Sequence, residues 1–289
     1  MRGHHPGAVC AYMLCVLLPV VFGINPVTAG TGLFSGLLLL ALLQRRLTLR
    51  EALLYPGLVL LSGILNPLFN HNGRTVLFFL NRNPVTGEAA LYGLVMGMMI
   101  AAALVWGRCF TLVMDTDRLL TVTGGLSPKV ALLLSMALRY IPLLRTQGRT
   151  IREAQRGLGL IRESNGIDRI HGALRVFDGM VTWGLENGIV MADSMAARGY
   201  GSGRRSRYRL YPWKRSDTLR TAGSLALLGI VLWARLSGRI GYTWYPELTV
   251  PPPSAEGTAG YLAFGALCAG GAVTEIKDRI KWKYLRSKI

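Results

Sequence analysis

The sequence lacks the motifs that mark most enzymes. It contains no GxxxxGK[S/T] phosphate-binding loop, no HExxH zinc site and no GxSxG nucleophile turn. Its histidines, which are His4, His5, His71 and His171, share no metal-ligand spacing with cysteine or carboxylate residues. We therefore expect no catalytic residue, no cofactor and no metal site, and no ATP hydrolysis by the chain itself.

Cysteine and acidic residues are also scarce. Cys10, Cys15, Cys109 and Cys268 stand in apolar stretches without CxxC or disulfide-framework spacing, which is typical of small buried residues. Asp and Glu number 15 against 33 Lys and Arg, yet only 17% of the 289 residues are charged and 51% are hydrophobic. Soluble domains average about 25% charged residues. The composition therefore indicates a membrane protein with cationic cytoplasmic parts, or else a nucleic-acid binder.

The apolar runs decide between these two classes. A membrane-spanning helix needs about 17–25 mostly apolar residues, and no run has the period-two alternation of a membrane strand. The candidate spans are 8–24, 27–43, 52–68, 89–114, 221–233 (extendable to 236) and 261–273 (extendable to 258). We predict an all-α polytopic membrane protein with about six transmembrane helices. In the fourth span, the small residues Gly93, Gly97 and Ala101 predict close packing against a neighbouring helix.

Lys and Arg are distributed very unevenly between the two sides of the membrane. With six spans, 27 of them fall on the side that holds both termini and only Arg74, Arg82 and Arg239 fall on the other. Without the long segment 115–218 the ratio is still 10 to 3. By the positive-inside rule, a multi-pass protein of the cell membrane with both termini in the cytoplasm is expected.

The spans divide the chain into three parts. Residues 1–114 hold the N-terminal membrane helices, 115–218 form a cytoplasmic domain, and 219–289 hold the C-terminal membrane helices and a basic tail. Within the cytoplasmic domain, 130–144 reads as a short apolar helix against the membrane face. Residues 145–162 follow with an arginine stripe at helical spacing: Arg145, Arg149, Arg152 and Arg156. The stripe is consistent with two roles: contact with solvent and anionic lipid headgroups, or binding of an acidic protein partner.

A second long helix is predicted over 177–198. It ends at Ala197-Arg198-Gly199, where glycine stops the helix and the arginine complements the negative end of the helix dipole. Capping of the helix C-terminus is sufficient to explain an arginine at position 198 without any partner protein.

Three passages together carry a family resemblance. The first is Leu65-Asn66-Pro67-Leu68-Phe69 followed by Gly73. The second starts at Ser135, contains Arg139 and Pro142, and runs on to Glu153-Ala154-Gln155-Arg156-Gly157. The third is Asp193 to Gly201. With these passages, the chain resembles the transmembrane coupling subunit (T component) of energy-coupling factor (ECF) transporters, a family that includes the cobalt-transport permease subunit.

The resemblance implies a non-catalytic subunit with two partners besides the lipid bilayer. Two long crossed coupling helices would each end in an Ala-Arg-Gly motif that docks on an ABC-type ATPase. These helices would transmit ATP-driven motion to a small membrane S component that binds a vitamin or a metal ion. The second motif is intact as Ala197-Arg198-Gly199. The first falls on Gly157-Leu158-Gly159, with Arg156 two positions before the expected arginine. Unequal contacts would suit a heterodimeric ATPase pair.

Other residues of the coupling helices are expected to pack the helices together or to contact the S component. They are Arg139, Pro142, Gly184, Gly188, Met191 and Met195. Glycine allows close crossing, and methionine adapts to varied partners.

Two alternatives belong to other classes. A membrane-embedded lipid-modifying enzyme would need convergent polar or metal-binding residues near a span end, which the sequence does not show. A basic membrane anchor that binds nucleic acid or anionic lipid would explain the net charge of +18. The positive-inside distribution accounts for much of that charge, so no nucleic-acid partner is expected.

Overall fold

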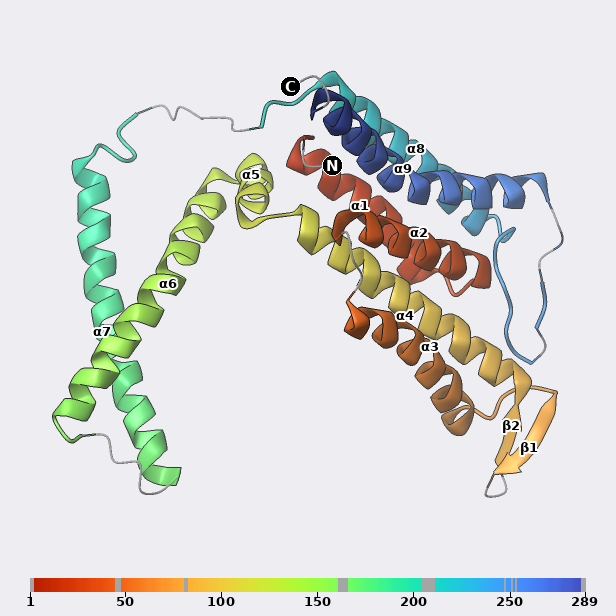
Figure 1. The fold of residues 1–289 in the computed structure, drawn as a ribbon, viewed down its shortest axis with the longest axis horizontal. Coiled ribbons are helices and arrows are strands. Elements are labelled where there is room, and N and C mark those ends of the chain that lie inside the picture. Colours follow the sequence, from red (N-terminus) through yellow and green to blue (C-terminus); the bar gives the residue numbers. More distant parts are fainter. Residues whose placement is uncertain are drawn as a thin grey trace. The chain divides into compact units, whose positions relative to one another are not determined.

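The computed structural model describes residues 3–44, 48–80, 83–160, 166–203, 211–246, 248–250, 252 and 254–286. It divides the chain into two compact units, one of residues 1–119 with 211–289 and one of residues 120–210. The first is called the membrane unit below and the second the helical-pair unit. The elements in chain order are α1 (Pro6–Phe22), α2 (Pro26–Gln44), α3 (Leu49–Phe69), β1 (Val76–Leu80), β2 (Asn83–Thr86), α4 (Gly87–Val113), α5 (Thr116–Leu126), α6 (Pro128–Gly157), α7 (Gly166–Ala197), α8 (Arg215–Leu236) and α9 (Ala255–Arg286) (Figure 1).

The predicted all-α membrane fold is confirmed. Within the described residues, five helices, α2, α3, α4, α8 and α9, are long and apolar enough to cross a membrane, and α1 is a shorter apolar helix of 17 residues. Four of the six predicted spans lie wholly within these helices, whereas the span 8–24 runs two residues past the end of α1 and the span 89–114 runs one residue past the end of α4. The antiparallel hairpin of β1 and β2, which joins α3 to α4, was not expected from the sequence.

The core of the membrane unit forms where α4 packs against α1, α2 and α3, and where α9 packs against α2 and α8. Trp106 of α4 is fully buried, and its indole Nε1 donates a hydrogen bond of 3.0 Å to the carbonyl of Gly32 in α2. Gly36 makes room for this side chain, since a Cβ atom there would lie 3.0 Å from the same Nε1. The core therefore depends on small residues of α2 facing large residues of α4.

Helices α3 and α4 approach each other at backbone distance. A Cβ atom on Gly93 would lie 2.6 Å from the carbonyl oxygen of Ser62, and one on Gly97 would lie 2.8 Å from the Cα of Val59. The Asn66 amide crosses the same contact and donates a hydrogen bond of 2.6 Å to the carbonyl of Ala89. The predicted close packing through the small residues of the fourth span is confirmed.

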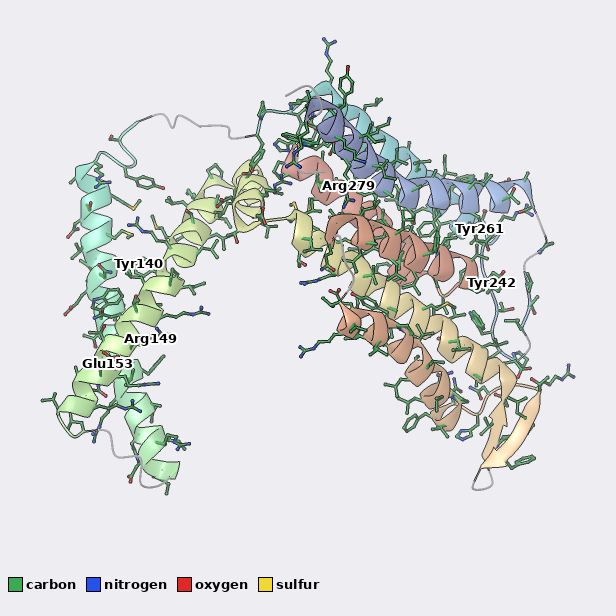
Figure 2. The ribbon with its side chains drawn as sticks, in the orientation of Figure 1. Tyr140, Arg149, Glu153, Tyr242, Tyr261 and Arg279 are labelled. Carbon is green, nitrogen blue, oxygen red and sulfur yellow. The ribbon has the colours of Figure 1, made fainter. Side chains whose placement is uncertain are left out.

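Arginines satisfy carbonyl groups at the ends of two membrane helices. The Arg235 guanidinium donates to the carbonyl of Phe22, the last residue of α1. Arg279, labelled in Figure 2, donates to the carbonyl of Leu42 in the last turn of α2. The last four carbonyls of a helix have no partner within the helix, so these contacts tie α8 and α9 to the ends of α1 and α2.

The loop between α8 and α9 packs onto the membrane unit through aromatic side chains. Trp244 donates from its indole nitrogen to the carbonyl of Ile24 at 3.1 Å, and its ring lies 5.5 Å from that of Tyr92. Asn25 donates to the carbonyl of Ile240 at 2.9 Å. Burial, reinforced by neighbouring Tyr261, raises the pKa of Tyr242 (Figure 2). Such amphipathic rings are typical of the membrane–water interface.

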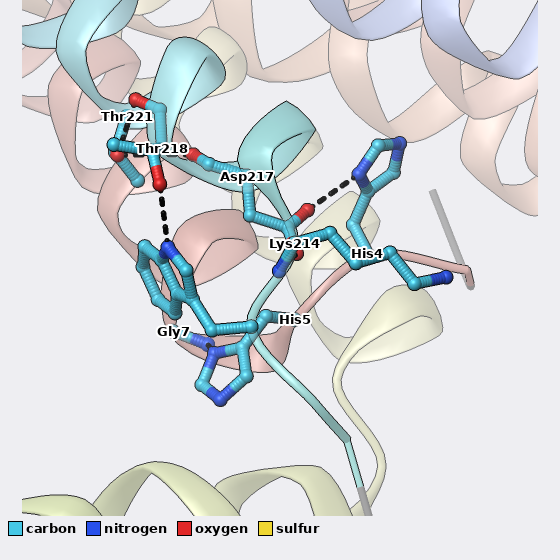
Figure 3. Close-up of polar contacts among 8 residues, drawn as sticks. His4, His5, Gly7, Lys214, Asp217, Thr218 and Thr221 are labelled. Atoms are coloured by element: carbon cyan, nitrogen blue, oxygen red, sulfur yellow. Dashed lines mark hydrogen bonds and ion pairs between the residues drawn. The ribbon is translucent and has the colours of Figure 1, made fainter.

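The N-terminal residues contact the start of α8 and hold it in place, as Figure 3 shows. The Nδ1 atom of His4 lies 2.7 Å from Oδ1 of Asp217, whose side chain is fully buried. The other carboxylate oxygen accepts a bond of 3.2 Å from the backbone N–H of Lys214. His5 packs on Trp213 with ring centroids 4.7 Å apart. No role for these two histidines could be predicted from the sequence, because their partners lie more than 200 residues away.

Candidate functional site

The helical-pair unit contains the two long helices α6 and α7, preceded by residues 120–126 of α5. The two segments expected separately at 130–144 and 145–162 form one continuous helix, α6, which ends at Gly157. Helix α7 begins at Gly166, well before the predicted start at Phe177, and ends at Ala197, one residue before the predicted end. Pro142 does not end α6. It is exposed, and so is the Arg139 side chain.

The two helices approach each other closely at two glycines that were not selected from the sequence. A Cβ atom on Gly148 of α6 would lie 2.8 Å from the sulfur of Met180, and one on Gly179 of α7 would lie 3.3 Å from the Ile151 side chain. Nearer the other end of the pair, the Tyr140 hydroxyl (Figure 2) lies 3.9 Å from the sulfur of Met191. Methionines of α7 therefore fill the space between the helices.

Two predicted packing residues do not take part in this crossing. Around Gly184 and Gly188, an added Cβ atom would meet nothing within 4 Å. The expectation that these glycines let the helices cross closely is therefore wrong, because the crossing point lies earlier along α7. Contact of Gly184, Gly188 and Met195 with an S component stays a prediction.

Helix α7 carries a continuous apolar stripe that nothing in its own unit covers. Of the described residues of α6 and α7, only Gly172 and Val176 are buried. The stripe follows helical spacing, with exposed fractions from 42% to 69%: Ile167, Ile170, Leu174, Phe177, Val181, Leu185 and Ile189. A contiguous exposed apolar surface rimmed by polar residues marks a protein or membrane contact.

Helix α6 carries the predicted arginine stripe on its surface. Arg145, Arg149, Arg152 and Arg156 are all exposed, and Figure 2 labels Arg149 beside Glu153 on this helix. The helical-pair unit therefore presents both an apolar and a cationic surface.

The end of α7 is a Schellman motif built around Gly199. The Tyr200 N–H donates to the carbonyl of Met195 at 3.0 Å, and the Gly199 N–H donates to the carbonyl of Ala196 at 2.9 Å. Gly199 has a φ of +77°, a left-handed conformation that glycine adopts without strain. This geometry makes Arg198 the cap residue. Arg198 is exposed, and its guanidinium has no hydrogen-bond or ion-pair partner among the residues that the structure describes.

The end of α6 has the same backbone geometry. The Leu160 N–H donates to the carbonyl of Gln155 at 3.0 Å, and the Gly159 N–H donates to the carbonyl of Arg156 at 3.0 Å. Gly159 has a φ of +67°. The cap residue here is Leu158, whose side chain is 74% exposed.

The two helix ends therefore correspond residue by residue. Gly157, Leu158 and Gly159 stand where Ala197, Arg198 and Gly199 stand in the other helix, in agreement with the correspondence that the family resemblance implies. Arg156 corresponds to Ala196, so it does not occupy the cap position. Its substitution for the missing arginine is not supported by this geometry.

Comparison with known proteins decides the family. The family described as CbiQ, cobalt transport protein, matches residues 2–209. The chain belongs to this family. The family match covers the membrane helices α1 to α4 and both helices of the helical-pair unit. Among the described residues, no three His, Cys, Asp or Glu side chains are placed to hold a metal ion.

Several relatives of this CbiQ-family chain are named energy-coupling factor transporter transmembrane protein EcfT. One from Streptococcus equi is 24% identical over 237 residues, which cover 76% of this chain and 87% of the relative. One from Lactococcus lactis is 26% identical, covering 63% of this chain and 73% of the relative. One from Listeria innocua is 31% identical over 109 residues, 37% of this chain and 41% of the relative. With the Listeria relative, and with one from Lactobacillus helveticus, the match spans about two fifths of the relative's length.

Proposed function

We propose that this chain is the non-catalytic transmembrane subunit of an ECF-type ABC importer for a vitamin or a metal ion. It would link two ABC-type ATPase subunits in the cytoplasm to a small membrane S component, with both of its own termini in the cytoplasm. Family membership and the names of the relatives support this role.

The observation that carries the proposal is the end of α7. Arg198 stands at an exposed helix cap, and Gly199 beside it has no side chain, so a partner backbone can approach closely. The guanidinium offers five N–H donors in a fixed planar fork, which suits a groove lined by carboxylates or carbonyls. A short rigid motif of this kind can transmit a push or a pull from an ATPase, because the Schellman hydrogen bonds fix it to a helix of 32 residues.

The apolar stripe of α7 is the proposed contact with the S component. It begins at Ile167 and continues to Ile189, about 33 Å along a helix at 1.5 Å per residue. An S component is a membrane protein, so an apolar surface on the coupling helices fits its chemistry. Met195 follows on the same helix, where the adaptable thioether suits a partner that changes position.

Purification from the native membrane in mild detergent tests the proposal. Tagged wild-type chain is compared with Arg198→Ala and with Arg149→Ala, which removes the same charge from an exposed site on α6. Quantitative mass spectrometry measures the copurified proteins. We expect ABC-type ATPases and a small hydrophobic protein with wild type and Arg149→Ala, and fewer ATPases with Arg198→Ala. ATPases retained equally by all three samples would refute the role of Arg198.

A fusion assay tests the proposed orientation. Reporter proteins that are active on only one side of the membrane are joined after Gly3 or Arg286, and into the β1–β2 hairpin. Cytoplasmic activity at both ends and external activity at the hairpin are expected, and any terminus found outside would contradict the topology.

A further inference from the structure

The β1–β2 hairpin turns an apolar strand outward. Strand β1 has the sequence Val76-Leu77-Phe78-Phe79-Leu80. The side chains of Val76, Leu77 and Phe79 are 45%, 64% and 70% exposed. Strand β2 is the one that contacts α3 and α4, and its residues Val85 and Thr86 are buried. The hairpin therefore packs on its own unit through β2 and leaves the apolar side chains of β1 uncovered.

Hydrogen bonds fix the base of the hairpin to the start of α4. The Glu88 carboxylate, in the first turn of α4, accepts bonds from the Thr75 backbone N–H at 3.2 Å and from the Thr75 hydroxyl at 2.7 Å. The Gly87 N–H donates to the carbonyl of Thr75 at 3.0 Å. The Thr86 hydroxyl donates to the carbonyl of Asn72 at 2.9 Å. These bonds hold β1 in a fixed position relative to a membrane-spanning helix.

The exposed surface of β1 continues the exposed surface of α3. The last turns of this span carry Leu65, Leu68 and Phe69, which are 41%, 40% and 81% exposed. Residues 70–75 then join α3 to β1. In Figure 1 the two strands lie across the direction of α3 and α4, at the end of these helices. A strand with this orientation at the end of a span runs along the membrane surface.

The neighbouring aromatic residues mark the same depth. Asn70, the first residue after α3, donates from its side-chain amide to the Tyr245 hydroxyl at 3.1 Å. The Tyr245 ring lies 5.6 Å from the ring of Tyr92. Tyrosine and tryptophan are enriched at the membrane–water interface. The base of the hairpin therefore lies at interfacial depth.

The hairpin fits the interface and does not fit the hydrocarbon core. Five residues of strand extend about 17 Å, whereas the core is about 30 Å thick, so β1 is too short to span it. A two-stranded sheet also has outer edges whose backbone N–H and C=O groups need partners, and the core has none to offer. At the interface, water and headgroups satisfy these edges while apolar side chains reach the acyl chains.

We propose that the β1–β2 hairpin is a lipid-binding anchor, which inserts β1 into the headgroup–acyl boundary of the leaflet on its side. Val76, Leu77 and Phe79 reach about 5–10 Å into this boundary. Arg74, exposed directly before β1, suits the lipid phosphates. The anchor sets the depth of α3 and α4 in the bilayer. The inference needs only the membrane fold and is independent of the proposed ATPase and S-component contacts.

Spin labels measure the depth of β1 directly. Leu77→Cys and Phe79→Cys are made in the full chain with Cys10→Ala, because Cys10 is partly exposed whereas the other three cysteines are buried. The labelled chains are placed in vesicles of phosphatidylethanolamine and phosphatidylglycerol. Power saturation with oxygen and with a water-soluble nickel chelate gives the depth of each label. Leu61→Cys, on the exposed surface of α3, and Ser202→Cys, exposed in the helical-pair unit, are the membrane and water references.

We expect both β1 labels about 5–10 Å below the lipid phosphates, with the Leu61 label deeper and the Ser202 label in water. Leu77→Asp, added to Phe79→Cys, should move the Phe79 label toward water. Leu77→Asn, which adds no charge, should move it less. If Leu77→Asp does not insert, the depths of the two single labels decide the proposal. β1 labels as accessible to the nickel chelate as Ser202 would overturn it.

A protein that covers β1 would give a different result. The same labels are measured in chain purified together with its native partners and returned to the same vesicles. Contact with lipid predicts unchanged depth and unchanged access to oxygen. Labels that lose access to both oxygen and the nickel chelate in the presence of partners would show that a protein occupies this strand, and would overturn the assignment to lipid.

Discussion

The close approach of α3 and α4 makes Gly93 the site where one methyl group should matter most. A Cβ atom there would lie 2.6 Å from the Ser62 carbonyl oxygen and 2.7 Å from the Cβ of Asn66, whereas ordinary contact begins near 3.4 Å. Gly93→Ala must therefore push the helices apart by roughly 0.8 Å, the difference between those distances. Such overpacking costs about 1–3 kcal/mol, and losing the Asn66–Ala89 hydrogen bond adds about 0.6 kcal/mol.

Gly107→Ala in the same helix is the matched control, since a Cβ atom there meets nothing within 4 Å. Both variants gain the same helix propensity, about 1 kcal/mol for alanine over glycine, so this gain cancels in the comparison. We expect Gly93→Ala to be less stable than Gly107→Ala by about 1.6–3.6 kcal/mol. Unfolding by titration with sodium dodecyl sulfate in mixed micelles, followed by tryptophan fluorescence, measures the difference. Equal midpoints for the two variants would show that α3 and α4 do not touch at Gly93.

Two further predictions concern the start of α8 and the end of α7. Asp217→Ala should lower the free energy of unfolding by about 2–3 kcal/mol, because it removes the buried acceptor for His4 and for the Lys214 N–H. His4→Ala should make the N-terminal residues more sensitive to proteolysis, and protease resistance equal to that of wild type would contradict this anchoring. Gly199→Ala should weaken ATPase retention although Arg198 is unchanged, since a φ of +77° costs a residue with a side chain about 1–2 kcal/mol. Gly184→Ala, at an open helical site, should retain the ATPase as wild type does, and equal retention by both variants would show that docking does not depend on the cap geometry.

The membrane helices were predictable from sequence because their signal is local. Length and apolar composition define each span, and small residues at four-residue spacing predicted that α4 packs closely against a neighbouring helix, which the structure shows to be α3. The end of α7 was equally local, because Gly199 stops the helix after its cap residue Arg198. The end of α6 at Gly157 was not predicted, since the expected segment ran to residue 162.

Contacts between distant parts of the chain could not be predicted in this way. Gly148 and Gly179 have no feature that distinguishes them from Gly184 and Gly188 in the sequence, and only the crossing angle and position of two long helices decide which pair meets. His4 and Asp217, or Trp244 and Ile24, likewise become neighbours only when the first and last membrane helices pack together.

Photo-cross-linking tests the central claim, that α7 joins an ATPase to a membrane partner, most directly. Benzoylphenylalanine replaces Tyr200, next to the cap, or Phe177, in the apolar stripe, and the cells are irradiated before purification. The account predicts that the probe at Tyr200 cross-links an ABC-type ATPase and that the probe at Phe177 cross-links a small hydrophobic membrane protein. A properly inserted chain whose Tyr200 probe captures no nucleotide-binding protein would contradict it.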